Sequence, residues 1–172
     1  MKKVKVPVFL VLLSLLALSA VLADSLRGVA FARLRSYDEV PALSTPGSGE
    51  FMATINADGS EINYRLHYSN LQGKVTQSHL HFGQKAVSGA IMIFLCSNLG
   101  NGPAGTQACP TEGTISGVIH ASDVIGNTQG IAPGELLEII QGIRGGVVYV
   151  NVHSDLFPSG EIRGQLQHSH HD

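Results

Sequence analysis

The strongest constraint on the fold is a strict alternation of apolar and polar residues in segment 61–68. Four apolar side chains fall on one face of an extended chain and three polar ones on the other: Ile62, Tyr64, Leu66 and Tyr68 against Asn63, Arg65 and His67. This period of two is typical of a strand with one buried face. The connection Ala57-Asp58-Gly59-Ser60 precedes it, and its Asp-Gly step predicts a hairpin with segment 50–56.

Further strand candidates follow along the chain, separated by turns rich in Gly, Pro, Asn and Ser. Beyond the hairpin, we expect strands at residues 28–35, 75–82, 90–96, 113–120, 147–153 and 161–167. Segment 136–143 differs, because its apolar spacing suits one or two helical turns. The pattern predicts a single all-β domain of eight or nine strands with one short helix. We expect the architecture to be a Greek-key β-sandwich.

The N-terminus has the composition of an export signal. Three lysines lie among the first five residues, segment 6–22 carries no charge, and Ala23 is a small residue at the expected cut. We therefore expect a signal peptide at residues 1–23 and a secreted or periplasmic protein. The alternative is an uncleaved membrane anchor, for which the apolar run is short. On the first interpretation, the protein meets the membrane only through its export signal.

The charge of the chain bears on its partners. Three of the 11 Lys and Arg residues lie in the predicted leader, so the remaining 8 are opposed by 13 Asp and Glu, a formal charge of −5. No basic cluster is visible along the rest of the sequence, which argues against a nucleic acid as partner. An unknown protein or an extracellular polymer is the partner class that remains.

The chain has two cysteines, Cys96 and Cys109, on either side of a loop rich in Gly, Asn and Pro. An even count in an oxidising compartment predicts a disulfide. The alternative is that Cys96 is a buried thiol at the end of a strand.

Three histidines are candidates for a metal site. His79 and His81 are two apart in a predicted strand and would share a face, with Leu80 pointing the other way, and His153 ends another predicted strand. Imidazole nitrogen suits copper and zinc, so these three could hold one such ion. Further candidate ligands are His120, His67 and Asp155, the last of which could instead orient an imidazole. The alternative is that His79 and His81 are hydrogen-bonded groups that pin the strand to a loop.

The closing hairpin carries polar residues that could form a network. Glu161 and Arg163 share a face of the last strand and would lie near Asn151 across the hairpin. Arg163 would then be either an anion guide at a metal site or part of a structural cross-strand pair. We place the domain at residues 24–167, followed by a His-rich C-terminal tail at 168–172 that could scavenge metal or have no role.

Five short motifs together resemble the CHRD (chordin) domain family. They are Asp38-Glu39-Val40-Pro41, Gly47-Ser48-Gly49, His79-Leu80-His81-Phe82-Gly83, Tyr149-Val150-Asn151-Val152-His153 and Gly160-Glu161-Ile162-Arg163-Gly164-Gln165. The resemblance extends from about Ala30 to Leu166. It implies an extracellular or periplasmic β-domain and says little about chemistry.

The order of His79, His81 and His153 is also similar to the copper ligands of Cu,Zn superoxide dismutase. There, a His-x-His pair and a histidine that ends a later strand bind copper. No histidine lies between Phe82 and His120, so the bridging ligand and the zinc loop of that family are both missing.

Two classes of function follow from these observations. The first is an exported, non-enzymatic CHRD-domain binding module that could hold copper or zinc through its histidines. The second is a mononuclear copper-dependent redox enzyme related to superoxide dismutase. No Gly-x-Ser-x-Gly elbow, Walker loop or dinucleotide fingerprint is present, and no acid, base and nucleophile set is recognisable. The sequence therefore favours the binding module.

Overall fold

The computed structural model describes residues 28–126 and 129–169. The predicted signal peptide lies outside the described residues. Within the described ranges, no helix is both long and apolar enough to cross a membrane.

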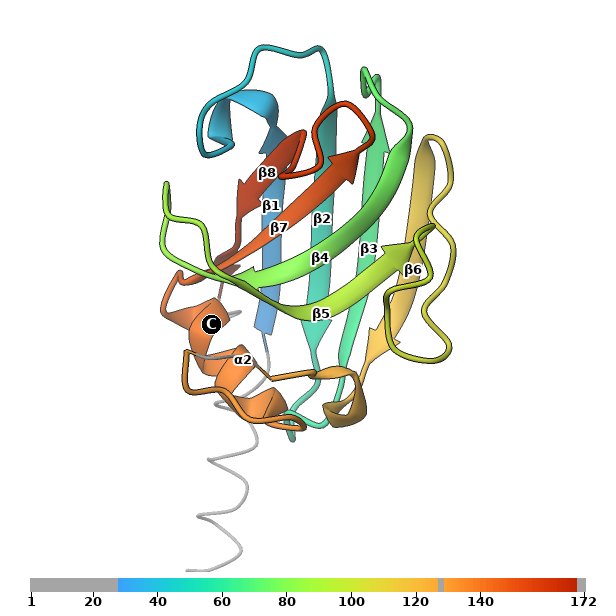
Figure 1. The fold of residues 1–172 in the computed structure, drawn as a ribbon. Coiled ribbons are helices and arrows are strands. Elements are labelled where there is room, and N and C mark those ends of the chain that lie inside the picture. Colours follow the sequence, from blue (N-terminus) through green and yellow to red (C-terminus); the bar gives the residue numbers. More distant parts are fainter. Residues whose placement is uncertain (1–27, 127–128, 170–172) are drawn as a thin grey trace, which may run out of the picture.

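Nine strands, one α-helix and two short 3-10 helices make up the described part of the chain (Figure 1). The elements are β1 (Gly28–Arg35), η1 (Ser36–Asp38), β2 (Ser48–Ile55), β3 (Ile62–Ser69), β4 (Val75–Phe82), β5 (Ala90–Ser97), β6 (Gly113–Ile119), η2 (Ala121–Asp123), α2 (Leu136–Arg144), β7 (Val148–Ser154), β8 (Ile162–Gln165) and β9 (Gln167–Ser169). The predicted strands agree with these bounds within two residues, except that the last one is divided. Its first part is β8, and its end belongs to β9, which continues to Ser169.

The strands form one continuous antiparallel sheet in the order β5-β4-β7-β8-β1-β2-β3-β6, with β9 also pairing with β1. The sheet curls so that β4, β5 and β7 lie across β1, β2 and β3 (Figure 1). Its two end strands, β5 and β6, approach each other and nearly close a barrel. The predicted all-β class is therefore confirmed, whereas two separate sheets of a sandwich are not found among the described residues. The sheet is continuous because the pair Arg35 and Arg163 joins β1 to β8.

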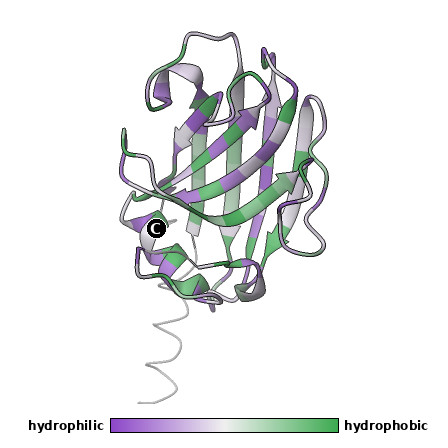
Figure 2. Ribbon diagram, in the orientation of Figure 1, coloured by the Kyte–Doolittle hydropathy of each residue, from purple (hydrophilic) through white to green (hydrophobic). Residues whose placement is uncertain are grey.

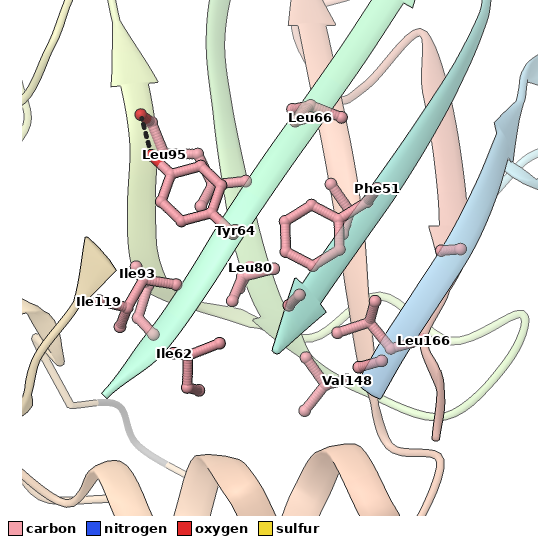
Figure 3. Close-up of a cluster of buried hydrophobic side chains, with 14 of the residues drawn as sticks. Phe51, Ile62, Tyr64, Leu66, Leu80, Ile93, Leu95, Ile119, Val148 and Leu166 are labelled. Carbon is pink, nitrogen blue, oxygen red and sulfur yellow. Dashed lines mark hydrogen bonds between the residues drawn. The ribbon is translucent and has the colours of Figure 1, made fainter. Parts of the chain in front are cut away.

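The core fills the space inside the curled sheet. In Figure 2, hydrophobic and hydrophilic residues alternate along the strands, as expected where one face of each strand is buried. Side chains from both layers meet inside, among them Phe51, Leu66, Leu80 and Val148, all at most 1% exposed (Figure 3). Helix α2 lies at one end of the sheet and buries its apolar stripe there, including Ile139 and the residues one turn before and after it.

A disulfide joins Cys96 to Cys109, with an S–S distance of 2.03 Å and a Cα–Cα distance of 5.1 Å. The alternative of a thiol at Cys96 is therefore wrong for this structure. The loop that it closes covers the gap between β5 and β6, because the Gln107 amide donates to the carbonyls of Leu95 (3.1 Å) and Ser116 (3.4 Å). Closing a loop of this length stabilises the fold by about 3 kcal/mol, mainly by restricting the unfolded chain.

Candidate metal centre

The three candidate histidines lie on one face of two neighbouring strands. Along β4, Leu80 points into the core, and His79 and His81 point to the opposite face. Strand β7 runs antiparallel to β4 and pairs His153 with Gln77, so His153 is the diagonal neighbour of His79. Every residue of β7 is buried, which shows that this outer face of the sheet is covered.

The side chains of His79, His81 and His153 form a compact buried cluster, which we call the histidine cluster. One nitrogen from each ring lies within 4.8 Å of those of the other two. The closest pair is His79 Nδ1 and His153 Nε2, which are 3.1 Å apart and share a hydrogen bond. The three residues are 0%, 7% and 5% exposed, respectively. The structure therefore brings together the three histidines that the sequence offered as candidate ligands, and their side chains are shielded from solvent.

Backbone carbonyls fix which nitrogen of two rings faces the cluster. His81 Nδ1 lies 3.0 Å from the carbonyl oxygen of Gly89, and His153 Nδ1 lies 3.0 Å from that of Pro158. A carbonyl oxygen only accepts, so each Nδ1 carries the proton and donates it. Each Nε2 is left with a lone pair, the state in which a histidine binds a metal ion.

Two nitrogens of the cluster have no hydrogen-bond partner in the described protein, namely His79 Nε2 and His81 Nε2. A buried polar atom without a partner costs about 1–3 kcal/mol. Most such atoms in folded proteins have a partner, so this pair is the feature of the cluster that a bound group would explain. The hypothesis that these histidines only pin β4 to a loop accounts for His81 Nδ1 and leaves both orphaned atoms unexplained.

Burial also lowers the basicity of the cluster. Desolvation, followed by the positive charge that His153 and His81 would carry, lowers the pKa of His79 to about 2. Desolvation lowers the pKa of His81 to about 4 despite its bond to Gly89, with further contributions from His153 and Arg163. The pKa of His153 is also lowered by burial. All three rings are therefore neutral at pH 7, as metal ligation requires.

Aromatic rings enclose the cluster from two sides. Phe94 of β5 meets His79 edge to face, with ring centroids 4.4 Å apart. Tyr149 of β7 stacks on His81, with centroids 4.7 Å apart and an angle of 7° between the planes. The guanidinium of Arg163 covers the Tyr149 ring at 3.4 Å from its centroid. Arg163, Tyr149 and His81 are thus linked by ring contacts.

Arg163 holds a loop in place. Its guanidinium donates to the carbonyl oxygens of Gln84 (3.0 Å) and Val87 (2.9 Å), both in the loop between β4 and β5. The side chain is 3% exposed, so this geometry matches a structural residue better than a guide for anions arriving from solvent. Glu161 is also buried, and its carboxylate accepts hydrogen bonds from the backbone N–H groups of Gln72 and Gly73.

The polar network around Asn151 contains an acid that the sequence did not single out as a site residue. The Asn151 amide donates to Glu39, and also to the carbonyl of Ile162. Burial raises the pKa of Glu39 to about 7, while Asn151 and the charge of Arg163 lower it in part. Gly160 lies against this pair with φ +131°, and a Cβ there would come within 2.6 Å of both side chains. The carboxylate that Asn151 binds is thus Glu39, where the sequence suggested Glu161.

The remaining candidate ligands lie elsewhere. His67 is on the exposed side of β3, 3.1 Å from the Thr114 hydroxyl. His120 precedes η2 and is exposed, 3.8 Å from a Glu61 oxygen. The Asp155 carboxylate accepts the backbone N–H of Lys74 at 2.8 Å. The structure brings none of these three into the histidine cluster.

The predicted C-terminal tail begins inside the sheet. His168 and Ser169 belong to β9, which pairs with Val29 and Ala30 of β1. The remaining tail residues, 170–172, lie outside the described residues.

Sequence reasoning missed the residues that surround the histidine cluster. Phe94, Gly89 and Pro158 come from segments without a chemical motif, and the last two contribute only carbonyl oxygens. Glu39 and Tyr149 did carry a signal, because both fall within motifs that resemble the CHRD family.

Fold and site together define a small all-β domain, a curled nine-stranded sheet in the described residues, with a buried cluster of three imidazoles on its outer face. The family comparison identifies this class: the chain matches the CHRD domain over residues 30–166 and belongs to that family. No curated protein and no solved structure matches it.

Proposed function

We propose that this CHRD-domain protein is an exported, non-enzymatic binding module that holds one copper or zinc ion between His79, His81 and His153. The observation that carries the proposal is the pair of orphaned nitrogens inside a buried three-histidine cluster. Its partner would be a protein or a polymer outside the cell, since the formal charge of −5 without the leader disfavours nucleic acid.

The spacing of the cluster suits a single ion. Zinc binds histidine nitrogen at about 2.0–2.1 Å, which places two ligands of a tetrahedral site about 3.3 Å apart. One nitrogen of each ring lies within 4.8 Å of those of the other two, and the hydrogen bond of 3.1 Å between His79 Nδ1 and His153 Nε2 is a contact that a bound ion would replace. Rotation of the rings about their side-chain bonds would then bring one nitrogen of each histidine to a common ion.

The burial of the histidine cluster favours a protein that holds an ion, rather than an enzyme that converts a substrate. A redox enzyme related to superoxide dismutase would need a coordination position that substrate can reach. No histidine of the cluster is more than 7% exposed, and Phe94 and Tyr149 lie against two of the rings. A site of this kind suits storage, transfer between proteins or structural stabilisation.

Metal analysis tests the proposal directly. The full chain with His170→Gln and His171→Gln, which removes two tail histidines, should bind one copper or zinc ion per chain at pH 7. The measurement is equilibrium dialysis followed by elemental analysis. A ratio near zero for both metals would refute the proposal.

Export makes a separate prediction. Protein recovered from the periplasm or the medium should begin at Asp24, and it should show no titratable thiol when unfolded without reductant, since Cys96 and Cys109 are joined. N-terminal sequencing and thiol titration check the two parts. A chain that stays in the cytoplasm with both thiols reduced would contradict this prediction.

A further inference from the structure

We propose that the ion held by the histidine cluster is monovalent copper, Cu(I), in preference to Zn(II) or Cu(II). This inference rests on the proposed function and names the ion that the site selects. Three features of the site support this inference: the lack of charge on its ligands, the positive charge of Arg163 on the far side of the Tyr149 ring, and the number of ligand nitrogens.

The ligands provide no negative charge. Within the described part of the chain, the metal-binding group consists of His79, His81 and His153, with no carboxylate and no thiolate. The cost of moving an ion from water into a site of low dielectric constant grows with the square of its charge. A buried set of neutral ligands therefore penalises a divalent ion about four times as much as a monovalent one in this Born picture.

Arg163 adds to the preference for a monovalent over a divalent ion. Its guanidinium lies 3.4 Å from the centroid of the Tyr149 ring, which in turn stacks on His81. The guanidinium charge is thus separated from the cluster by a single aromatic ring. The repulsion between this charge and a bound ion is twice as large for a divalent ion as for a monovalent one.

Two acids near Arg163, Glu39 and Asp38, offset this charge in part. The side-chain hydrogen bonds of these two carboxylates come from other residues, from Asn151 to Glu39 and from Arg35 to Asp38. Arg163 is therefore the charged group that contacts the cluster through the Tyr149 ring.

The number of donors also favours Cu(I). Zinc bound by three histidines usually takes a water molecule as its fourth ligand. Here the rings are enclosed by Phe94 and Tyr149, and the cluster side chains are at most 7% exposed. Cu(I) is satisfied by two or three imidazoles, so it needs no water in this site.

The first test compares affinities in the wild-type site. The full chain with His170→Gln and His171→Gln is titrated without oxygen. Cu(I) is kept reduced by ascorbate and competes between the protein and bicinchoninate. Zn(II) and Cu(II) are titrated in separate experiments in which a chromophoric chelator competes with the protein. Ag(I) serves as a monovalent ion that does not change oxidation state. We expect Cu(I) and Ag(I) to bind one per chain, with dissociation constants at least about tenfold below those of Zn(II) and Cu(II), a difference of about 1.4 kcal/mol or more.

The second test isolates the charge of Arg163. Arg163→Gln should tighten Zn(II) binding by roughly the square of the factor by which it tightens Cu(I) binding, because the Coulomb energy is proportional to the charge of the ion. Arg163→Lys keeps the charge and should preserve the wild-type preference. Circular dichroism verifies that each variant is folded, and the wild-type titrations stand if Arg163→Gln does not fold.

The outcomes separate this inference from the proposed function. One Zn(II) or Cu(II) per chain, bound more tightly than Cu(I), would overturn the preference for Cu(I) and leave the metal site standing. Equal effects of Arg163→Gln on Cu(I) and Zn(II) would overturn the electrostatic origin of the selectivity. If no ion bound at all, the proposed function would fail together with this inference.

Discussion

Replacing both His79 and His81 with Gln is expected to abolish metal binding and to leave the nine-stranded sheet folded. The substitution leaves only His153 of the histidine cluster, and one imidazole does not hold an ion against water. Glutamine keeps polarity and can still donate to the Gly89 carbonyl, so the packing of β4 should survive. Elemental analysis after dialysis measures the loss, and circular dichroism checks the fold.

The same variant should also lose stabilisation by metal. An ion that binds only the folded state stabilises it by about 2.7 kcal/mol at 100 times its dissociation constant, and by about 4.1 kcal/mol at 1,000 times. Wild-type protein should therefore show a Tm that rises with metal concentration, and His79→Gln/His81→Gln a Tm that does not. His67→Gln/His120→Gln is the matched control, because both of these histidines are exposed and outside the cluster. If the first variant retained one ion per chain, the ligands would have to be sought elsewhere.

The parts of the fold that depend on local pattern could be predicted from the sequence. Alternation placed β3 correctly, and the Asp-Gly turn placed the hairpin with β2. The same rule set His79 and His81 on one face of β4. It also placed His67 on the polar face of its strand with Arg65, and this face is the exposed one in the structure. The local pattern thus already disfavoured His67 as a ligand.

The parts that depend on long-range pairing could not be predicted. His153 joins the cluster because β7 pairs with β4 in a register that sets His153 opposite Gln77, and no local pattern encodes that register. Glu39 reaches Asn151 across 112 positions of sequence. A single pair of residues joins β8 to β1, so one continuous sheet and two separate sheets would leave nearly the same pattern in the sequence.

The stability of the metal-free protein should fall steeply as the pH is lowered from 7 toward 4. In the unfolded chain, histidines take up a proton near pH 6.5. In the folded chain the pKa of His81 is lowered to about 4 and that of His79 to about 2, and that of His153 is also lowered. Between these values only the unfolded state binds the protons, so acid favours unfolding.

Glu39 acts in the opposite direction. Its pKa is raised to about 7 in the folded state, so its protonation favours folding as the pH falls from about 7 toward the model value of 4.5. The three histidines destabilise the folded state as the pH falls, whereas the single Glu39 carboxyl stabilises it. The net effect between pH 7 and pH 4.5 is a loss of stability. His81 alone accounts for roughly 3 kcal/mol between pH 6.5 and 4, at 1.36 kcal/mol per unit of pKa shift.

Urea unfolding of the protein in the presence of a chelator, at intervals from pH 7 to pH 4.5, measures this dependence. The variant His79→Gln/His81→Gln provides the control, because it retains Glu39 and His153, whose effects oppose each other. Its free energy of unfolding should therefore fall less over the same range, because the contributions of His79 and His81 are gone. Equal stability of the wild-type protein at pH 7 and pH 5 would mean that its histidines are protonated in the folded state. Neutral imidazoles would then not be available at mildly acid pH, and the cluster would release its metal there.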